Sequence, residues 1–215
     1  SFLLTFFCIT CVNAIDIDGV LDEEEWGSAH QISEFTTIVP FNFEDPEYQT
    51  NVKIFTNKDG IYIGFVNEQD NETIRSFNHI RDDWDERGDK NSFTIDFDGN
   101  SKVAYGFTVS LGGSLSDATY TNGNDESKDW DGDWIAKTFR GDNFWSSEFF
   151  IPWTVVPMQK IDGSKRKIKF IAFRWLASEE YGFGSTKTNW SRETFMYDLE
   201  ELVIDNYESK KYSYF

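Results

Sequence analysis

Residues 50–66 read Thr50-Asn51-Val52-Lys53-Ile54-Phe55-Thr56-Asn57-Lys58-Asp59-Gly60-Ile61-Tyr62-Ile63-Gly64-Phe65-Val66 and carry the clearest secondary-structure signal in the chain. Two runs rich in β-branched and aromatic residues, 50–56 and 61–66, flank the polar turn 57–60. Asp-Gly between two such runs is a strong hairpin signal, because glycine accepts a positive φ without a steric clash. The stretch therefore predicts a pair of antiparallel strands.

Alternating patterns continue beyond this hairpin. Residues 92–98 place Phe93, Ile95 and Phe97 on one face of a strand, and 103–111 repeat the alternation. Four more strands are predicted at 134–140, 144–151, 167–176 and 197–204. Residues 152–156 can form one helical turn, because proline is tolerated at a first helical position. Many short strands with turn signals and no long helix predict an all-β fold, an antiparallel β-sandwich of two stacked sheets, jelly-roll-like or immunoglobulin-like.

Three long polar segments separate these strands. They are expected to be loops, and they span residues 67–91, 114–133 and 177–197. Trp84 lies in the first loop and Trp190 in the third. Because binding residues are concentrated on loops held by a rigid scaffold, these two tryptophans are candidates for ligand contact.

The segment 17–26 marks the start of the folded part. Asp18-Gly19 is a turn dipeptide, and Leu21 and Trp26 provide apolar anchors around the acidic run 22–25. That run suits the exposed first turn of a short helix. We interpret the segment as an N-terminal clasp of the sandwich.

Composition limits the partners. The chain has 215 residues and 38 acidic side chains against 20 Lys and Arg, which gives a net charge of −18. A field of this sign repels nucleic acid and anionic membranes, so neutral or cationic partners are expected. Aromatic residues are abundant, with 21 Phe, 9 Tyr and 8 Trp. Some of them are expected to face a ligand.

Residues 2–13 are uncharged and largely apolar, and Val12-Asn13-Ala14 is an acceptable cleavage site. This pattern predicts a partial secretory signal peptide over 1–14, one sandwich domain over 15–204, and a truncated linker or the start of a further region over 205–215. Cys8 and Cys11 both lie in the signal segment, so their spacing is not interpreted as a redox or zinc motif. The protein is expected to be exported in a bacterium, to the periplasm, the outer membrane or the exterior.

An ordered series of motifs resembles a carbohydrate-binding module of family 9. The residues that carry the resemblance are Ile17-Asp18-Gly19-x-Leu21-Asp22-Glu23-x-x-Trp26-x-x-Ala29, Ile61-Tyr62-Ile63-Gly64-Phe65, the segment 89–98, Trp130-Asp131-x-x-Trp134, Trp145-x-x-Glu148-x-x-Ile151-Pro152 and Asn189-Trp190. The match spans roughly residues 15–204. The Trp130–Trp134 and Phe173–Trp175 segments look similar to a subgroup in which the module precedes a region resembling an outer-membrane β-barrel.

The resemblance implies non-catalytic binding of an oligosaccharide or polysaccharide by a module that is expected to be monomeric. Trp84 and Trp190 match the two tryptophans between which the family holds a sugar ring. Arg174, Asn189 and Arg192, together with Glu193, are candidates for orienting the sugar hydroxyls. Where family members place charged or amide residues on the central strands, this chain has Thr94 and Thr108.

The acidic run around Gly132 is a candidate calcium site. Asp129, Asp131 and Asp133 offer hard oxygen ligands at high density, and the family resemblance implies structural calcium. The spacing does not follow an EF-hand loop, and charge runs are usually solvated surface. Both interpretations remain open at this point.

Two other classes of function compete with sugar binding. The same sandwich could be a periplasmic accessory domain of an outer-membrane protein without sugar affinity, which the threonines at 94 and 108 favour. A haem site would have to use Met158, Met196, His30 or His79, and these show no recognisable pairing. No Ser-His-Asp order or phosphate-binding glycine loop is present in the sequence, so an enzyme active site is not predicted.

Overall fold

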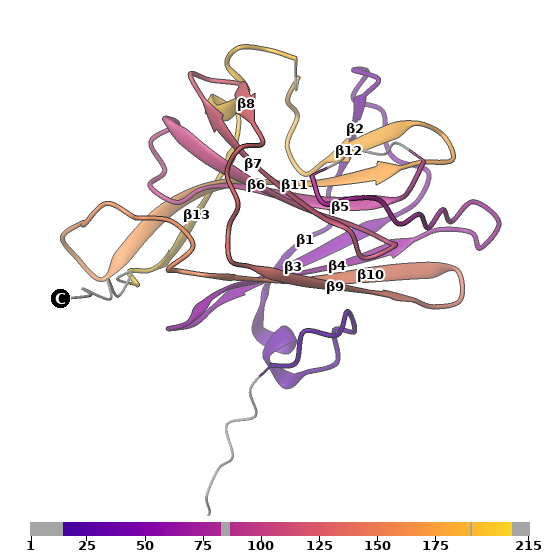
Figure 1. The fold of residues 1–215 in the computed structure, drawn as a ribbon, viewed down its shortest axis with the longest axis horizontal. Coiled ribbons are helices and arrows are strands. Elements are labelled where there is room, and N and C mark those ends of the chain that lie inside the picture. Colours follow the sequence, from indigo (N-terminus) through magenta and orange to yellow (C-terminus); the bar gives the residue numbers. More distant parts are fainter. Residues whose placement is uncertain (1–14, 83–86, 190, 208–215) are drawn as a thin grey trace, which may run out of the picture.

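The computed structural model describes residues 15–82, 87–189 and 191–207, and its two sheets lie one above the other (Figure 1). Sheet A is antiparallel, with the order β1-β3-β4-β10-β9. Its strands are β1 (His30–Ile32), β3 (Thr50–Thr56), β4 (Gly60–Glu68), β9 (Ile135–Arg140) and β10 (Phe144–Pro152). The hairpin predicted at 50–66 and the strands predicted at 134–140 and 144–151 lie side by side in this sheet, through the pairing of β4 with β10.

Sheet B has the order β2-β12-β11-β5-β6-β7-β8, and β13 also pairs with β11. Its strands are β2 (Thr36–Val39), β5 (Lys90–Asp96), β6 (Val103–Ser110), β7 (Leu115–Thr121), β8 (Asp125–Ser127), β11 (Lys165–Leu176), β12 (Tyr181–Gly184) and β13 (Glu200–Asp205). The first half of β11 pairs with β13 and the second half with β12. The predicted antiparallel β-sandwich is confirmed.

The main core lies between the two sheets. Phe93 and Ile95 of β5, Phe107 and Val109 of β6 and Phe149 of β10 are fully buried there. Because side chains alternate along a strand, each inward aromatic leaves its chain neighbours on the outer face of sheet B. The face that points away from sheet A is therefore lined by short polar residues such as Ser92 and Thr108.

Three strands lie where the sequence predicts polar loops. β7 and β8 occupy part of 114–133, and β12 occupies part of 177–197. The loop prediction is wrong there because neither face of β7 is strongly apolar. Its sequence therefore does not show the alternation of apolar and polar residues that indicates a strand. The helical turn expected at 152–156 is also absent: β10 ends at Pro152, and Val155 N–H donates to the Pro152 carbonyl in a turn.

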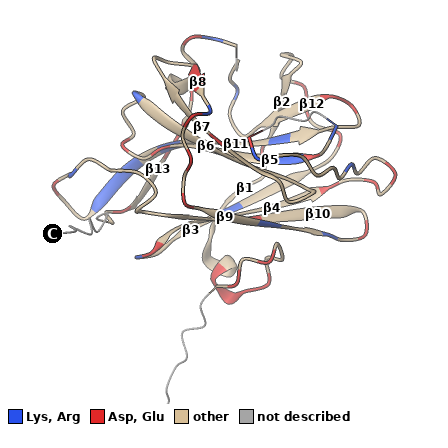
Figure 2. Cartoon of the chain, in the orientation of Figure 1, with Lys and Arg blue, Asp and Glu red and all other residues tan. Residues whose placement is uncertain are grey.

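The described helices are two short 3-10 segments, η1 (Glu24–Ser28) and η2 (Phe195–Tyr197). None of the helices within the described ranges is long and apolar enough to cross a membrane. η1 lies on the outer face of sheet A, below the sandwich in Figure 1, and acidic residues are concentrated around it (Figure 2). Lys165 and Lys167 of β11 pair with Asp205 and Glu201 of β13.

The N-terminal segment is held on sheet A by a buried carboxylate. Glu148 of β10 is fully buried and accepts the Asp18 and Gly19 N–H groups at 3.0 and 2.8 Å. Its other oxygen accepts the Trp26 indole N–H at 3.2 Å, which Glu23 also accepts at 3.0 Å. Gly19 has a φ of +98°, and a Cβ there would lie 2.6 Å from the Thr138 backbone. The clasp predicted for residues 17–26 therefore depends on glycine and on Glu148.

Candidate functional site

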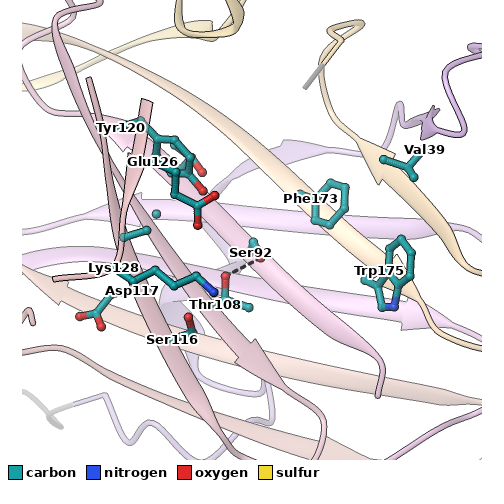
Figure 3. Close-up of a pocket in the computed structure, with 13 residues that line it drawn as sticks. Val39, Ser92, Thr108, Ser116, Asp117, Tyr120, Glu126, Lys128, Phe173 and Trp175 are labelled. Carbon is teal, nitrogen blue, oxygen red and sulfur yellow. Dashed lines mark hydrogen bonds between the residues drawn. The ribbon is translucent and has the colours of Figure 1, made fainter. Parts of the chain in front are cut away.

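A pocket of about 520 Å³ lies on the outer face of sheet B (Figure 3). It crosses the strands of the sheet, with Val39 of β2 at one end and Glu126 of β8 at the other. Its lining residues are Val39, Ser92, Thr94, Gly106, Thr108, Ser116, Asp117, Ala118, Tyr120, Glu126, Lys128, Phe173 and Trp175. Strands from the N-terminal, central and C-terminal parts of the chain thus share one concave surface.

The floor of the pocket carries hydroxyl groups. Ser92 and Thr94 alternate with the core residues of β5, and Thr108 and Ser116 come from β6 and β7. Ser92 and Thr108 are register partners, and their hydroxyl oxygens lie 2.7 Å apart. A hydroxyl can both donate and accept hydrogen bonds, so this floor suits a ligand that carries both kinds of group.

Aromatic rings line the pocket beside this floor, and glycines make room for two of them. A Cβ at Gly182 of β12 would lie 2.7 Å from the Phe173 ring, and one at Gly106 of β6 would lie 2.9 Å from the Tyr120 ring. Burial raises the pKa of the Tyr120 phenol, so its hydroxyl stays protonated. Trp175 neighbours Phe173 on the same face of β11. The pocket therefore combines apolar ring surface with polar groups.

Charged residues stand at the β7–β8 end. Lys128 extends over the pocket in Figure 3, and its Nζ donates to the Asp82 carbonyl at 3.3 Å. Glu126 is exposed nearby on β8. Asp117 is buried and accepts from the Gly132 N–H at 2.7 Å and the Trp134 indole at 3.0 Å. Burial raises the pKa of the Asp117 carboxyl.

Arg174 lies on the opposite face of β11 from the pocket. Its side chain is fully buried between the sheets, where the guanidinium donates to the Gln49 and Glu68 carbonyls at 3.2 and 2.8 Å and to the Thr50 hydroxyl at 2.9 Å. Burial lowers its pKa to about 10. Arg174 therefore forms hydrogen bonds within the protein interior and does not line the pocket.

The other predicted sugar contacts are loop residues. Asn189 and Arg192 lie three positions apart, and the Arg192 N–H donates to the Asn189 carbonyl at 3.0 Å. The segment η2 follows them, and its Phe195 packs edge-on against Tyr120 of the pocket at 5.7 Å between ring centroids. Trp84 and Trp190 lie outside the described residues.

The carboxylates expected to bind calcium do not gather as a set. Among the described residues, Asp131 lies in a cluster with Asp82 and Asp117 instead, all within 4.8 Å of one another. Arg81 occupies this cluster: its Nη2 donates to Asp117 at 2.9 Å and its Nε to Asp131 at 3.2 Å. The cluster therefore already has a cation and does not fit an open calcium site. Calcium binding by Asp129, Asp131 and Asp133 stays a prediction.

The candidate haem donors are spread over separate parts of the fold. His30 is exposed in β1, and the His79 backbone is tied to Ser114. Met196 is buried in the hydrophobic cluster on the outer face of sheet B, whereas Met158 packs against the core between the two sheets. These positions give the haem hypothesis no site among the described residues.

Most of the pocket residues were not predicted as site residues from the sequence, among them Ser92, Tyr120, Phe173 and Trp175. The alternation along β11 could have found two of them, because Phe170, Ala172 and Arg174 point into the sandwich and so send Phe173 and Trp175 outward. No comparable signal existed for Tyr120, which lies on a strand that the sequence presents as a loop.

Comparison with protein-family models gives no match, and no curated protein matches the chain. Solved structures do match. A proposed carbohydrate-binding protein from Bacteroides uniformis is similar with a TM-score of 0.59 and 11% identity, over 80% of this chain and 86% of that one. A family 9 carbohydrate-binding module from Caldicellulosiruptor kristjanssonii in complex with glucose gives 0.57 and 11%, over 88% and 90%.

The same family 9 module in complex with cellotriose gives a TM-score of 0.57 and 12% identity, over 94% of each chain. At this sequence identity, the similarity establishes a shared backbone fold and does not establish shared binding-site residues. The chain therefore has the fold of the family 9 carbohydrate-binding modules.

Proposed function

We propose that this protein is a non-catalytic carbohydrate-binding module and that it holds a sugar in the pocket on sheet B. The observation that carries the proposal is the combination of a hydroxyl-lined floor with aromatic rings in one pocket of about 520 Å³. A sugar ring offers an apolar face and a rim of hydroxyls, so it needs both surfaces at once. The architecture shared with sugar-binding modules supports the same conclusion.

Each part of the pocket has a role in this proposal. Phe173 and Trp175 contact the apolar face of the sugar, while Ser92 and Thr108 exchange hydrogen bonds with its hydroxyls. Lys128 and Glu126 orient polar groups at the β8 end. Stacking by Trp84 and Trp190 is part of the proposal. Asp82, two residues before Trp84, accepts hydrogen bonds from the Asp117 N–H and from Lys128 Nζ, both of which belong to pocket residues.

Isothermal titration with glucose and with cellotriose tests this. Gly106→Val adds a branched side chain to the pocket floor, and its Cβ would lie 2.9 Å from the Tyr120 ring. This variant is expected to weaken sugar binding at least about tenfold. The matched control is Gly27→Val on η1, where an added Cβ meets no atom within 4 Å. Thermal unfolding of both variants checks that the sandwich stays folded.

Trp84→Ala and Trp190→Ala test the stacking separately. Each is expected to abolish oligosaccharide binding while thermal stability barely changes. Unchanged affinity in both variants would remove the tryptophans from the site but leave the pocket residues in place.

A second candidate function is supported by one observation. Thr94 and Thr108, which stand where family members place charged or amide residues, both line the pocket. Neutral hydroxyls give weaker orientation of a sugar than ionised groups do. An exported accessory domain of an outer-membrane protein, without sugar affinity, would fit this. Absence of binding across a broad glycan array, together with cofractionation of the full-length protein with outer membranes, would select this function.

A further inference from the structure

Two phenylalanines that follow the pocket residue Val39 in the chain are exposed. Phe41 is 51% exposed and Phe43 is 37% exposed, and both lie in the segment that follows β2. Their ring centroids are 4.5 Å apart, with an angle of 68° between the ring planes. Large rings that stay in solvent side by side offer a contact surface and contribute little to the core.

The loop that carries these rings is ordered by hydrogen bonds. The Thr37 N–H donates to the Glu44 carbonyl at 2.8 Å, and the Phe43 N–H donates to the Thr37 carbonyl at 2.9 Å. Phe43 adopts a φ of +58°, a left-handed conformation that is uncommon for a bulky side chain. Backbone strain of this kind persists only where surrounding contacts maintain it, so the rings are held in a defined place.

The loop that carries the two rings begins next to a pocket residue. Val39 is the last residue of β2 and lines the pocket, and only Pro40 separates it from Phe41. β2 is also the edge strand of sheet B, at the opposite end from β8. A chain-like ligand that lies across the strands and leaves the pocket at Val39 therefore passes the loop that carries the two rings.

We propose that Phe41 and Phe43 form an outer subsite that stacks on the sugar residues of an oligosaccharide extending past Val39. This rests on the proposed function of the pocket. Glu44, Asp45 and Glu47 follow in the same exposed segment, so their charge opposes an anionic membrane surface and suits a neutral glycan chain.

The test compares a short and a longer ligand by isothermal titration. Phe41→Ala and the double variant Phe41→Ala/Phe43→Ala are expected to weaken cellotriose binding about fivefold or more, while glucose affinity stays within about twofold. Phe41→Tyr keeps the ring and is expected to retain cellotriose affinity. Phe139→Ala is the matched control, because Phe139 is 41% exposed on β9 of sheet A.

The outcomes separate the two proposals. Glucose binding to the wild type, combined with unchanged cellotriose affinity in the double variant, would refute the outer subsite and leave the pocket standing. Absence of binding to the wild type across a broad glycan array, glucose and cellotriose included, would overturn the pocket and the subsite together. Phe41→Leu, an apolar residue without a ring, gives the same readout if the alanine variants unfold.

Discussion

Replacing Glu148 by glutamine should change how the stability of this protein depends on pH. Glu148 is fully buried in the N-terminal clasp, and burial raises its pKa from 4.5 to about 7, with a further contribution from the charge of Glu23. Backbone N–H groups of Gly19 and Asp18 oppose this rise. The folded protein therefore holds the Glu148 proton more tightly than the unfolded chain does.

The sign and size follow from this difference. A pKa that is higher in the folded state means that the free energy of unfolding falls as pH rises from about 4.5 to about 7, and is flat on either side. Because each factor of ten in proton affinity is worth about 1.4 kcal/mol, the full loss is about 3 kcal/mol. Glutamine does not titrate, so Glu148→Gln should lose this part of the pH dependence.

The assay is urea unfolding followed by tryptophan fluorescence at intervals from pH 4 to pH 8. The useful quantity is the wild-type minus variant difference, because burial also raises the pKa of Asp89, Asp96 and Asp117 and gives both proteins a slope of the same sign. A difference that stays constant over this range would refute the reasoning. Glu23→Gln removes the neighbouring charge and should move the upper end of the transition to lower pH.

Two further substitutions test the packing. Gly64→Ala places a Cβ 2.3 Å from Leu21 Cδ2 and should cost about 1–3 kcal/mol and speed proteolytic cleavage within residues 15–28, whereas Gly27→Ala should do neither. Equal protection of the two variants would contradict this account of the clasp. Arg174→Met leaves the Gln49 and Glu68 carbonyls without their donor and Asp89 without its nearby cation, so urea unfolding should show a loss of about 3–5 kcal/mol. The exposed Arg192→Met should stay within about 0.5 kcal/mol, and a similar small loss at Arg174 would show that its buried bonds are not needed.

Sequence patterns predicted the parts of the fold in which one strand face is apolar. The hairpin at 50–66 has β-branched residues around Asn57-Lys58-Asp59-Gly60, and Asn57 does cap that turn by accepting the Asp59 and Gly60 N–H groups. The alternation of Phe93, Ile95 and Phe97 likewise identified a strand that faces the core. In such segments the burial of one face decides the register, so local pattern and tertiary structure agree.

The pocket could be predicted only in part, for a physical reason. Its walls come from strands whose outer faces are partly packed against other residues and partly open to the pocket. Their side chains therefore mix Ser, Thr, Ala and aromatic residues. β7 is such a strand: Ser116, Ala118 and Tyr120 form one of its faces. Thr94 and Thr108 were noticed as departures from a family pattern, but the pairing of Thr94 with Gly106 and of Thr108 with Ser92 appears only in three dimensions.

Arg174 illustrates the opposite limit. A cation in an apolar run indicates function as readily as structure when only the sequence is known. In the fold, alternation along β11 turns it inward, where backbone carbonyls and the Thr50 hydroxyl accept hydrogen bonds from its guanidinium. Which face a residue takes depends on strand register, and register is a property of the whole sheet.

The order of sheet B has a consequence for how the protein acquires its pocket. Val39 of β2 pairs with Gly182 of β12, and Glu126 of β8 closes the other end, so the surface joins segments that leave the ribosome at very different times. Pairings between distant segments form slowly and late, because a long loop must close first. The pocket is therefore expected to be complete only after β11, β12 and β2 have docked. The appearance of sugar binding during folding would then indicate that all strands of sheet B have assembled.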